Sequence, residues 1–420
     1  MLKPEDNERI SRVAAGTPMG TTLRRYWLPA CLSEELPEAD GAPIRVRLLG
    51  EDLVAFRDGD GAIGLVDAFC PHRRAPMFFG RNEERGLRCV YHGWKFDRAG
   101  ACVDMPSEPP DSLFRTKVTI AAYPVWEGGG IVWAYLGPPA AQPPPPDFEI
   151  CRAPATHRHT TKNFQDCNWL QAVEGAIDSS HSTFLHCNDI TDRTLLRANA
   201  PEIDFEPSPY GLAGAAIHEL DGARRYARTF HYVLPVHSIR GRITGRRGES
   251  EPVPTITGQV FAPIDDTTCW LYSYEYSADP AIPFTDAFLA EREAMWGRDR
   301  ENVTADYRLR SNRTNDYGID RRLQKTTSYS GIAGMNVQDI ALQEGMGAIV
   351  DRSAEHLAHS DRVIIAARRL LMEAIADVER GAAPRATDPN VYRTVRGADH
   401  IIAAGTDWRS AYRDDLIARF

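Results

Sequence analysis

The chain lacks any segment long and apolar enough to cross a lipid bilayer. No apolar run in its 420 residues approaches the roughly 18 residues that a membrane-spanning helix needs. Its start, MLKPEDNERISRVAAGTPMG, is charged and polar where a secretory signal carries an apolar centre. These absences argue against a membrane or secreted protein, and we expect a cytoplasmic one.

The chain is also poor in positive charge and in cysteine. Its net charge is −9, and basic residues form only short clusters such as GRRG at 245–248, which argues against a nucleic-acid partner. Eight cysteines are too few for a dense disulfide framework in a chain of this length, and a reducing compartment would keep them as thiols or metal ligands. With 43% hydrophobic and 25% charged residues, the composition is that of a globular protein of two or three domains.

Short strands dominate the first third of the chain. The stretch PIRVRLLGEDLVAFRDGDGAIGLVDAFC alternates apolar and polar residues around the turn DGDG, and similar patterns continue to KVTIAAYPVWEGGGIVWAYLG. Proline-rich residues 137–154 suit an extended connector, because proline disrupts central strands and helix interiors. We therefore predict an all-β first domain that, with an N-terminal extension and the connector, covers residues 1–155.

The remaining residues, 156–420, combine both kinds of pattern. Strand-like stretches occur within residues 208–276, and helical patterns are found at 166–186, 286–303, 336–357 and 360–381. The predicted fold class is α+β: the all-β domain is followed by a mixed α+β catalytic domain with an antiparallel sheet flanked by helices.

Two matched pairs of metal-binding residues lie in the all-β part. Cys70 and His72 are two positions apart, Cys89 and His92 are three apart, and sixteen residues separate the pairs. Structural zinc is one interpretation, although a Cys-x-His pair is tighter than the usual zinc spacing, and four unrelated core residues are another. Mixed pairs suit a two-iron cluster in which cysteines hold one iron and histidines the other, because neutral imidazole raises the reduction potential.

A second group of possible ligands lies in the predicted helix 166–186. His181 and His186 are five residues apart, with Asp178 three before the first. Side chains at such spacings can share a helix face, and two histidines with one carboxylate form the facial triad of non-haem iron(II) oxygenases. Taken alone, two histidines on a helix are explained as readily by chance as by a metal site.

The motif CPHR…CVYHGWKFD resembles the signature of Rieske [2Fe–2S] domains, specifically those fused to ring-hydroxylating oxygenases of the phthalate dioxygenase type. Relatives of that type include chlorobenzoate dioxygenases and aryl O-demethylases. The resemblance covers nearly the whole chain and is also carried by RRYWLPA, DMPSEP and NVQDIALQEGMG. It implies that Cys70 and Cys89 hold one iron of the cluster and that His72 and His92 hold the other.

The same resemblance implies roles at the second site. His181 and His186 would ligate a mononuclear Fe(II), with Asp339 of NVQDIALQEGMG as the third ligand. Glu344 and Asp351 lie nearby in sequence, and spacing alone does not separate them from Asp339. Asp178 would be the catalytic acid between two metal centres, accepting hydrogen bonds from an iron-ligating histidine and from a Rieske histidine of a neighbouring subunit.

By this resemblance the chain is the oxygenase component of a mono- or dioxygenase that hydroxylates an aromatic carboxylate, phthalate- or benzoate-like, with O₂. Its electrons would come from NADH through a separate reductase carrying flavin and a [2Fe–2S] cluster, and it would assemble as a homotrimer or stacked hexamer. An alternative with the same metals is an oxidative O-demethylase of a methoxylated aromatic acid. A Rieske electron-transfer protein is an alternative of another class, but it would not require the second ligand set.

An aromatic acid needs a cation in its pocket, and the arginine fork matches a carboxylate best. We expect most arginines to lie in solvent and some to face the pocket; the candidates are Arg224, Arg225, Arg228, Arg240, Arg242, Arg246 and Arg247. His218 is a further candidate, with a core histidine as the plainer interpretation. The cysteines without paired spacing are expected to be buried free thiols: Cys31, Cys102, Cys151, Cys167, Cys187 and Cys269.

Overall fold

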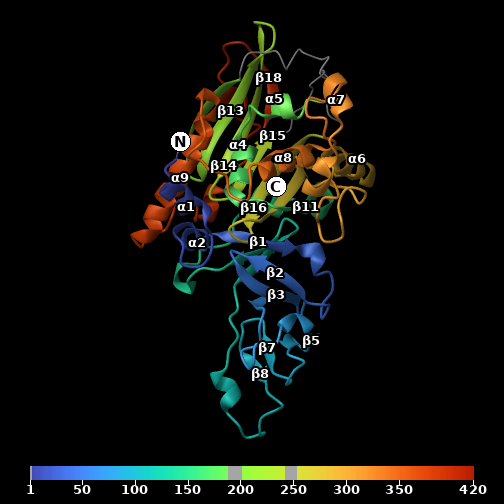
Figure 1. Cartoon of the computed structure of the whole chain (residues 1–420), viewed down its shortest axis with the longest axis vertical. Coiled ribbons are helices and arrows are strands. Elements are labelled where there is room, and N and C mark those ends of the chain that lie inside the picture. Colours follow the sequence, from blue (N-terminus) through green and yellow to red (C-terminus); the bar gives the residue numbers. More distant parts are fainter. Residues whose placement is uncertain (1, 188–200, 242–252) are drawn as a thin grey trace.

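The structure, a computed structural model, describes residues 2–187, 201–241 and 253–420. The molecule is elongated (Figure 1): small sheets of the N-terminal third occupy one end, and a large sheet with its helices occupies the other. Within the described residues, no helix combines the length and apolarity required to cross a membrane.

Three small antiparallel sheets build the narrow end, with strand orders β1-β10-β9, β2-β3-β4 and β5-β6-β7-β8. The turn predicted at DGDG joins β3 to β4, and it is stabilised by the Asp58 carboxylate, which accepts hydrogen bonds from the amides of Asp60 and Ala62. The strands are β1 (Trp27–Leu32), β2 (Ile44–Leu48), β3 (Glu51–Arg57), β4 (Ile63–Asp67), β5 (Arg81–Glu83), β6 (Gly86–Arg88), β7 (Lys95–Asp97), β8 (Cys102–Asp104), β9 (Val125–Gly128) and β10 (Ile131–Tyr135).

A single antiparallel sheet of eight strands forms the wide end. Its order is β11-β17-β16-β15-β14-β13-β12, and β18 pairs with β14 beyond the end of β15. The central strands β16 and β17 are buried almost throughout, which explains their richness in aromatic and β-branched residues. The strands are β11 (Arg158–Gln165), β12 (Glu202–Ser208), β13 (Gly211–Glu219), β14 (Arg224–Val233), β15 (His237–Gly241), β16 (Thr255–Pro263), β17 (Cys269–Ser277) and β18 (Asp399–Ala403).

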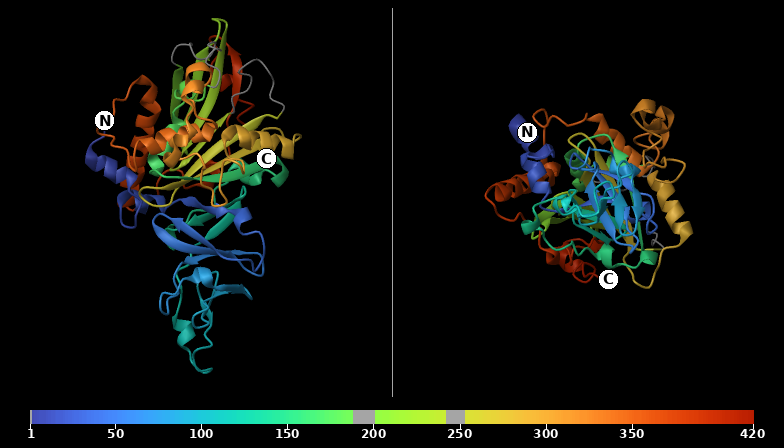
Figure 2. Two further views of the ribbon diagram at one scale, coloured as in Figure 1. Left: turned by 45° about the vertical axis from the view of Figure 1, so that its right-hand side comes forward. Right: turned by 90° about the horizontal axis from the view of Figure 1, so that it is seen from below.

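Helices cover one face of this sheet (Figure 2), and α4 lies directly across β15 and β16 with α8 against it. The Asn168 side chain starts α4 by accepting a hydrogen bond from the amide of Leu170. The helices are α1 (Pro4–Ser11), α2 (Pro18–Leu23), α3 (Glu149–Arg152), α4 (Trp169–Ile177), α5 (Ser182–Leu185), α6 (Asp286–Trp296), α7 (Arg321–Thr326), α8 (Met335–Gly345), α9 (Arg362–Glu379) and α10 (Trp408–Ala411).

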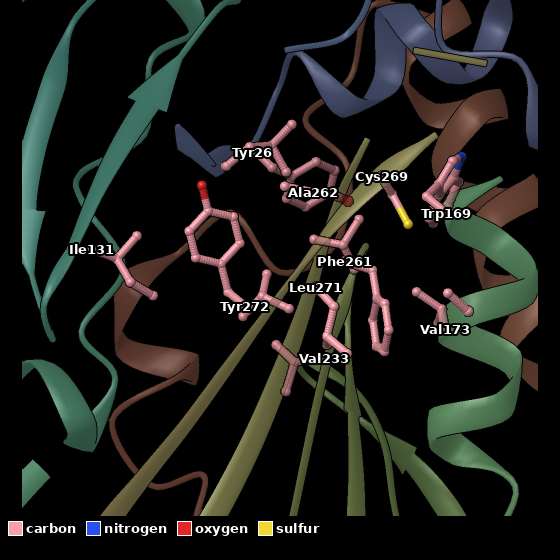
Figure 3. Packing of buried hydrophobic residues seen from close by; sticks show 14 of the residues in the cluster. Tyr26, Ile131, Trp169, Val173, Val233, Phe261, Ala262, Cys269, Leu271 and Tyr272 are labelled. Atoms are coloured by element: carbon pink, nitrogen blue, oxygen red, sulfur yellow. The ribbon is translucent and has the colours of Figure 1, made fainter. Parts of the chain in front are cut away.

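The hydrophobic core continues through the sheet (Figure 3). Trp169 and Val173 of α4 face Phe261 of β16 and the neighbouring residues of β17. The side chain of Tyr272, also from β17, projects from the opposite face of the sheet. Alternation along β17 places successive side chains on opposite faces, so one strand contributes to both layers. Burying a side chain such as Phe261 contributes about 1.5–3 kcal/mol to folding. The floor beneath α4 is therefore rigid, which fixes the residues that follow the helix.

The N-terminal extension lies with the large sheet's helices. Both α1 and α2 contact α9, and α1 also contacts α4. Trp169 donates its indole N–H to the carbonyl of Ser11 at 3.1 Å, and Arg352 donates to the Asn7 side chain at 2.9 Å. Within the predicted connector, residues 137–154, the stretch 142–148 forms neither helix nor strand, but the four-residue helix α3 at Glu149–Arg152 departs from the extended form expected there. The division of the chain at residue 155 stays a prediction.

The helix predicted for residues 166–186 is wrong in its second half. Helix α4 ends at Ile177 because Asp178 takes extended backbone angles (φ −76°, ψ 108°), and the four-residue α5 begins only at Ser182. His181 and His186 therefore flank α5 and do not share a face of one long helix. The helices predicted at 286–303 and 336–357 are also shorter than expected, since Gly297 (φ +72°) ends α6 and α8 ends at Gly345.

Candidate functional site

Two tight loops present the Cys–His pairs. The first loop follows β4, where the amide of Arg74 donates to the carbonyl of Cys70 at 2.9 Å. The second joins β6 to β7, where the amide of Gly93 donates to the carbonyl of Cys89 at 2.9 Å. Gly93 has φ +77°, a left-handed conformation that glycine adopts without strain, so the chain can reverse directly after His92.

The four predicted cluster ligands converge between these loops. The rings of His72 and His92 lie 4.4 Å apart, and Cys70 and Cys89 are close enough to interact. Burial raises the pKa of the Cys70 thiol to about 11; the His72 amide opposes this shift and the nearby Cys89 adds to it. The Nδ1 atom of His72 is buried and has no hydrogen-bond partner among the described residues. A metal cluster would satisfy these donors, so the residues fit an iron–sulfur group with two thiolate and two imidazole ligands.

Aromatic rings surround this loop pair. Trp94 is 4% exposed and stacks on His72 with a centroid distance of 4.3 Å, and its indole N–H donates to the Ser107 hydroxyl. Tyr91 lies beside His92 but is 57% exposed. One side of the predicted cluster is thus shielded from water, and the other is close to the molecular surface.

A second donor set assembles between α5 and α8. His181, His186 and Asp339 offer atoms that lie mutually within 4.8 Å. The Nε2 atoms of the histidines are 3.2 Å apart, and Asp339 Oδ1 lies 3.4 Å from His181 Nε2 and 3.2 Å from His186 Nε2. Three ligands at right angles around a metal with bonds of about 2.1 Å have donor atoms about 3.0 Å apart. The triangle therefore fits one face of an octahedral iron site.

Charge is concentrated at this triangle. Burial opposes the charged form of Asp339, but His186 and His181 outweigh it and hold the pKa of the carboxyl group well below its ordinary value. Burial likewise opposes protonation of His181, but the carboxylates of Asp178 and Asp339 raise its pKa to about 9. A divalent cation would take the place of these protons and hold the same three groups together.

Asp178 lies directly behind His181. Its Oδ2 is 3.7 Å from His181 Nδ1, and its Oδ1 accepts a hydrogen bond from the amide of Ser180 at 2.7 Å. Burial favours the neutral acid, yet the contact with His181 lowers the pKa of Asp178. The end of α4 fixes this position, because the amide of Asp178 closes the last turn on the carbonyl of Glu174.

A buried ion network, which we did not predict, anchors α4. Glu174 accepts hydrogen bonds from Arg352 at 2.8 Å and from Arg368 at 2.7 Å, and Arg368 also pairs with Glu355. Glu174 belongs to α4 and Arg368 to α9, whereas Arg352 and Glu355 lie in the segment between α8 and α9, so spacing gave no sign of this network. Gln338, next to Asp339, was also missed; its side chain contacts His186 at 2.8 Å.

The alternatives to Asp339 lie elsewhere. Glu344 accepts the amide of Asp166 at 2.8 Å and contacts the hydroxyl of Tyr317. Asp351 is exposed and accepts hydrogen bonds from Ser353. Neither belongs to the donor triangle, which leaves Asp339 as the carboxylate beside the two histidines.

Among the candidate arginines, Arg240 stands apart because it is held within the sheet beneath α4. Its guanidinium donates to the carbonyl of Ala176 at 3.1 Å. Arg224 and Arg225 pair with acidic residues at the surface, and Arg228 donates to the carbonyl of Gly241. The other three lie outside the described residues: Arg242, Arg246 and Arg247. His218 lies half-buried on β13, 6.2 Å from the ring of Tyr226.

The six remaining cysteines are free thiols, as expected, and all are buried except the half-buried Cys151. Two further histidines, His157 and His159, lie apart from the triangle. His157 contacts the carbonyl of Pro280, and His159 lies 3.3 Å from Glu293.

Comparison with protein families gives two matches that follow one another. Residues 26–124 match the Rieske [2Fe-2S] domain, and residues 134–417 match the family described as LigXa C-terminal domain like. The first match contains both Cys–His pairs, and the second contains the whole donor triangle.

Similar curated proteins span nearly the same length. The chain is 36% identical to the 3-chlorobenzoate-3,4-dioxygenase oxygenase subunit of Comamonas testosteroni, covering 99% of each protein. It is 36% identical to the phthalate 4,5-dioxygenase oxygenase subunit of Pseudomonas putida, covering 97% of this chain and 94% of that one. The chain is 33% identical to the 5,5'-dehydrodivanillate O-demethylase oxygenase subunit of Sphingobium sp., covering 94% of this chain and 86% of that one.

Solved structures show the same fold at lower identity. Pseudomonas putida NdmA with caffeine has a TM-score of 0.63 at 19% identity, covering 92% of this chain and 98% of that one. Dicamba monooxygenase bound to dicamba has a TM-score of 0.61 at 18% identity, covering 85% of this chain and 98% of that one.

Proposed function

The chain belongs to the Rieske non-haem iron oxygenases, as an oxygenase subunit of the phthalate dioxygenase type, and we propose that its substrate is an aromatic carboxylate. It is an oxidoreductase with a Rieske [2Fe–2S] cluster and a mononuclear iron, and it depends on a separate reductase for electrons. The observation that carries the substrate proposal is the half-buried guanidinium of Arg240, which is close enough to Asp339 of the donor triangle to interact with it electrostatically.

Arg240 occupies a position that favours an anionic ligand. It pairs across the sheet with Thr257 and Phe230, and it reaches the carbonyl of Ala176, two residues before Asp178. Within the described parts of the chain, no carboxylate lies within 4.0 Å of it. Burial lowers the pKa of Arg240 to about 10, and the like charge of Arg228 adds to this shift. Asp339 and Glu275 oppose the shift but are not in contact with the guanidinium, so a bound carboxylate could pair with it directly and offset the cost of its partial burial.

We assign the metal ligands by the same reasoning. Cys70, Cys89, His72 and His92 would hold the cluster, and the triangle of His181, His186 and Asp339 would hold the iron by one face. When bound, the iron supplies oxygen activation with its open positions, and the cluster supplies an electron. The carboxylate of Asp178, 3.7 Å from His181 Nδ1, would favour a proton at Nδ1 by its charge and so leave Nε2 as the ligand atom. Arg240 would orient the substrate by its carboxylate, so that one ring edge faces the site.

The two metal sites lie at opposite ends of one chain in Figure 1, where β7 and β8 are distant from α5. Electron transfer therefore requires a second copy, and we propose a head-to-tail homotrimer, alone or stacked as a hexamer. Exposed apolar side chains occur at both ends that would meet. Around the cluster loops they are Val90, Tyr91, Leu113 and Phe114. Beside the triangle they are Phe184, Tyr329, Leu342 and Met346.

Oxidative O-demethylation of a methoxylated aromatic acid is the second candidate. It is favoured by the 33% identity to an O-demethylase oxygenase subunit over 94% of this chain. Both reactions use the same metals and the same carboxylate anchor, so the residues described above serve either. We place the enzyme in the cytoplasm, where NADH is available to its reductase.

The direct test is a substrate panel of phthalates, chlorobenzoates and methoxybenzoates, assayed with a reductase, NADH and O₂. Formaldehyde release with a methoxybenzoate identifies demethylation, and a diol product identifies dihydroxylation. Arg240→Leu should reduce kcat/KM by roughly 10- to 100-fold, the value of a charge-assisted hydrogen bond. Arg240→Lys should lose less, and Arg224→Leu, an exposed and ion-paired control, should change little. Equal activity on the neutral methyl esters would contradict the proposal.

A further inference from the structure

The two histidines of the donor triangle are supported by different partners. His181 presents its Nδ1 to the carboxylate of Asp178 at 3.7 Å. His186 presents its Nδ1 to Oε1 of the Gln338 side chain at 2.8 Å. Both Nε2 atoms face the third ligand, Asp339. One histidine is thus backed by an anion and the other by a neutral amide.

The orientation of the Gln338 amide is fixed by its second contact. Its Nε2 donates to the carbonyl of Ile332 at 2.8 Å, so the oxygen of the amide must be the atom that faces His186. An amide oxygen only accepts hydrogen bonds; therefore Nδ1 of His186 must carry the proton in this contact. Both side chains are buried, with 0% of Gln338 and 8% of His186 exposed, so water does not compete.

We propose that Gln338 is a positioning residue that fixes His186 as the Nδ1–H tautomer, so that Nε2 is the atom offered to the iron. A neutral imidazole can coordinate through either nitrogen, and the hydrogen bond at the other nitrogen decides which one. The inference rests on the assignment of His186 as an iron ligand under the proposed function.

The arrangement makes α8 responsible for two of the three ligands. Asp339 comes from α8 directly, and the neighbouring Gln338 controls the ring of His186 from the same turn. The carbonyl of Ile332 belongs to the segment that leads into this helix. The start of α8 therefore sets both the distance from Asp339 to the histidines and the distance from Gln338 to His186. A shift of α8 would move the carboxylate and turn the imidazole together.

The test measures Co(II) binding to protein freed of mononuclear iron, with the Rieske cluster retained. Gln338→Leu should weaken Co(II) binding by roughly 10- to 100-fold, the usual effect of losing a hydrogen bond behind a ligand. Gln338→Glu keeps an acceptor facing Nδ1 and should bind Co(II) more tightly than Gln338→Leu. The visible spectrum of bound Co(II) should change in Gln338→Leu and be largely recovered in Gln338→Glu.

Gln343→Leu is the matched control, because Gln343 is also a buried glutamine of α8 but contacts Gln165. Its Co(II) affinity should equal that of the unmodified protein, and the Rieske absorbance of all variants should be unchanged. Equal losses in Gln343→Leu and Gln338→Leu, or an unchanged affinity in Gln338→Leu, would overturn the inference. His186→Ala separates the two levels of argument: if it keeps full Co(II) affinity, the assignment of His186 itself fails.

Discussion

The two metal sites of this protein are built in contrasting ways. The cluster ligands come from two short loops separated by sixteen residues, and each loop is closed by its own backbone hydrogen bonds. The donor triangle joins residues 181 and 186 to residue 339, and only the packing of α4 and α8 on the large sheet brings them together. A local site tolerates change in the rest of the chain, whereas a site assembled over long range depends on it.

The two sites also differ in charge. Cysteines and histidines alone form the cluster site, close to the surface at one end of the molecule. The triangle lies between carboxylates and is supported from behind by the buried network around Glu174. Changes at the second site should therefore affect charge, stability and metal binding together, and changes at the first should affect the cluster alone.

Separate loss of one site gives the largest expected effect. His181→Ala removes one of the three ligands of the triangle, so the mononuclear iron should be lost. Turnover should then be abolished, and the iron content should fall from about three to about two atoms per chain. The Rieske absorbance should persist, because no cluster ligand is altered. Metal analysis and visible spectroscopy of the purified variant measure both. Loss of the Rieske spectrum would show that the two sites are not independent.

Breaking the ion network should destabilise the wide end of the molecule. Glu174→Ala leaves Arg352 without a carboxylate partner, while Arg368 keeps Glu355, and an unpaired buried charge costs about 3–5 kcal/mol of unfolding free energy. Chemical denaturation followed by tryptophan fluorescence measures this loss. Glu379→Ala, which removes a surface partner of Arg9, should cost less than about 1 kcal/mol. Equal losses in the two variants would contradict the role of the network.

Asp178→Asn should separate electron transfer from metal binding. The amide keeps the shape of the side chain but loses the charge that faces His181, and such changes typically reduce activity by roughly 10- to 100-fold. Iron content should remain near that of the unmodified protein. The measurement is the rate at which the reduced Rieske cluster is oxidised in a single turnover. An unchanged rate would show that Asp178 takes no part in electron transfer between the cluster and the iron.

Metal affinity at the triangle should depend on pH. Carboxylates raise the pKa of His181 to about 9 in the metal-free site, so the imidazole is protonated at neutral pH and must release a proton to bind metal. Co(II) affinity should therefore rise about tenfold per pH unit up to pH 9 and then level off, since one proton is released per metal. Titration at several pH values tests this, and Asp178→Asn should shift the plateau to lower pH.

The contrast between the sites also explains what the sequence predicted. The order of an all-β part and a mixed α+β part followed from alternation and proline content, and the family motif led to the metals. The geometry at Asp178 was not predicted, because a helical pattern through residues 166–186 hides the break after Ile177. Gln338 and Glu174 were missed since their partners lie 152 to 194 residues away, and no local pattern encodes such a pairing.

The packing of the N-terminal helices has a consequence for how the protein is made. Asn7 and Ser11 meet Arg352, a partner 345 residues further along from Asn7. At about 5–20 residues per second, the ribosome needs roughly 20–70 seconds to produce that partner after Asn7 emerges. Helix α1 must thus wait for a partner that is made much later before it can find its final place. The cluster-binding loops, by contrast, can close on each other long before translation ends.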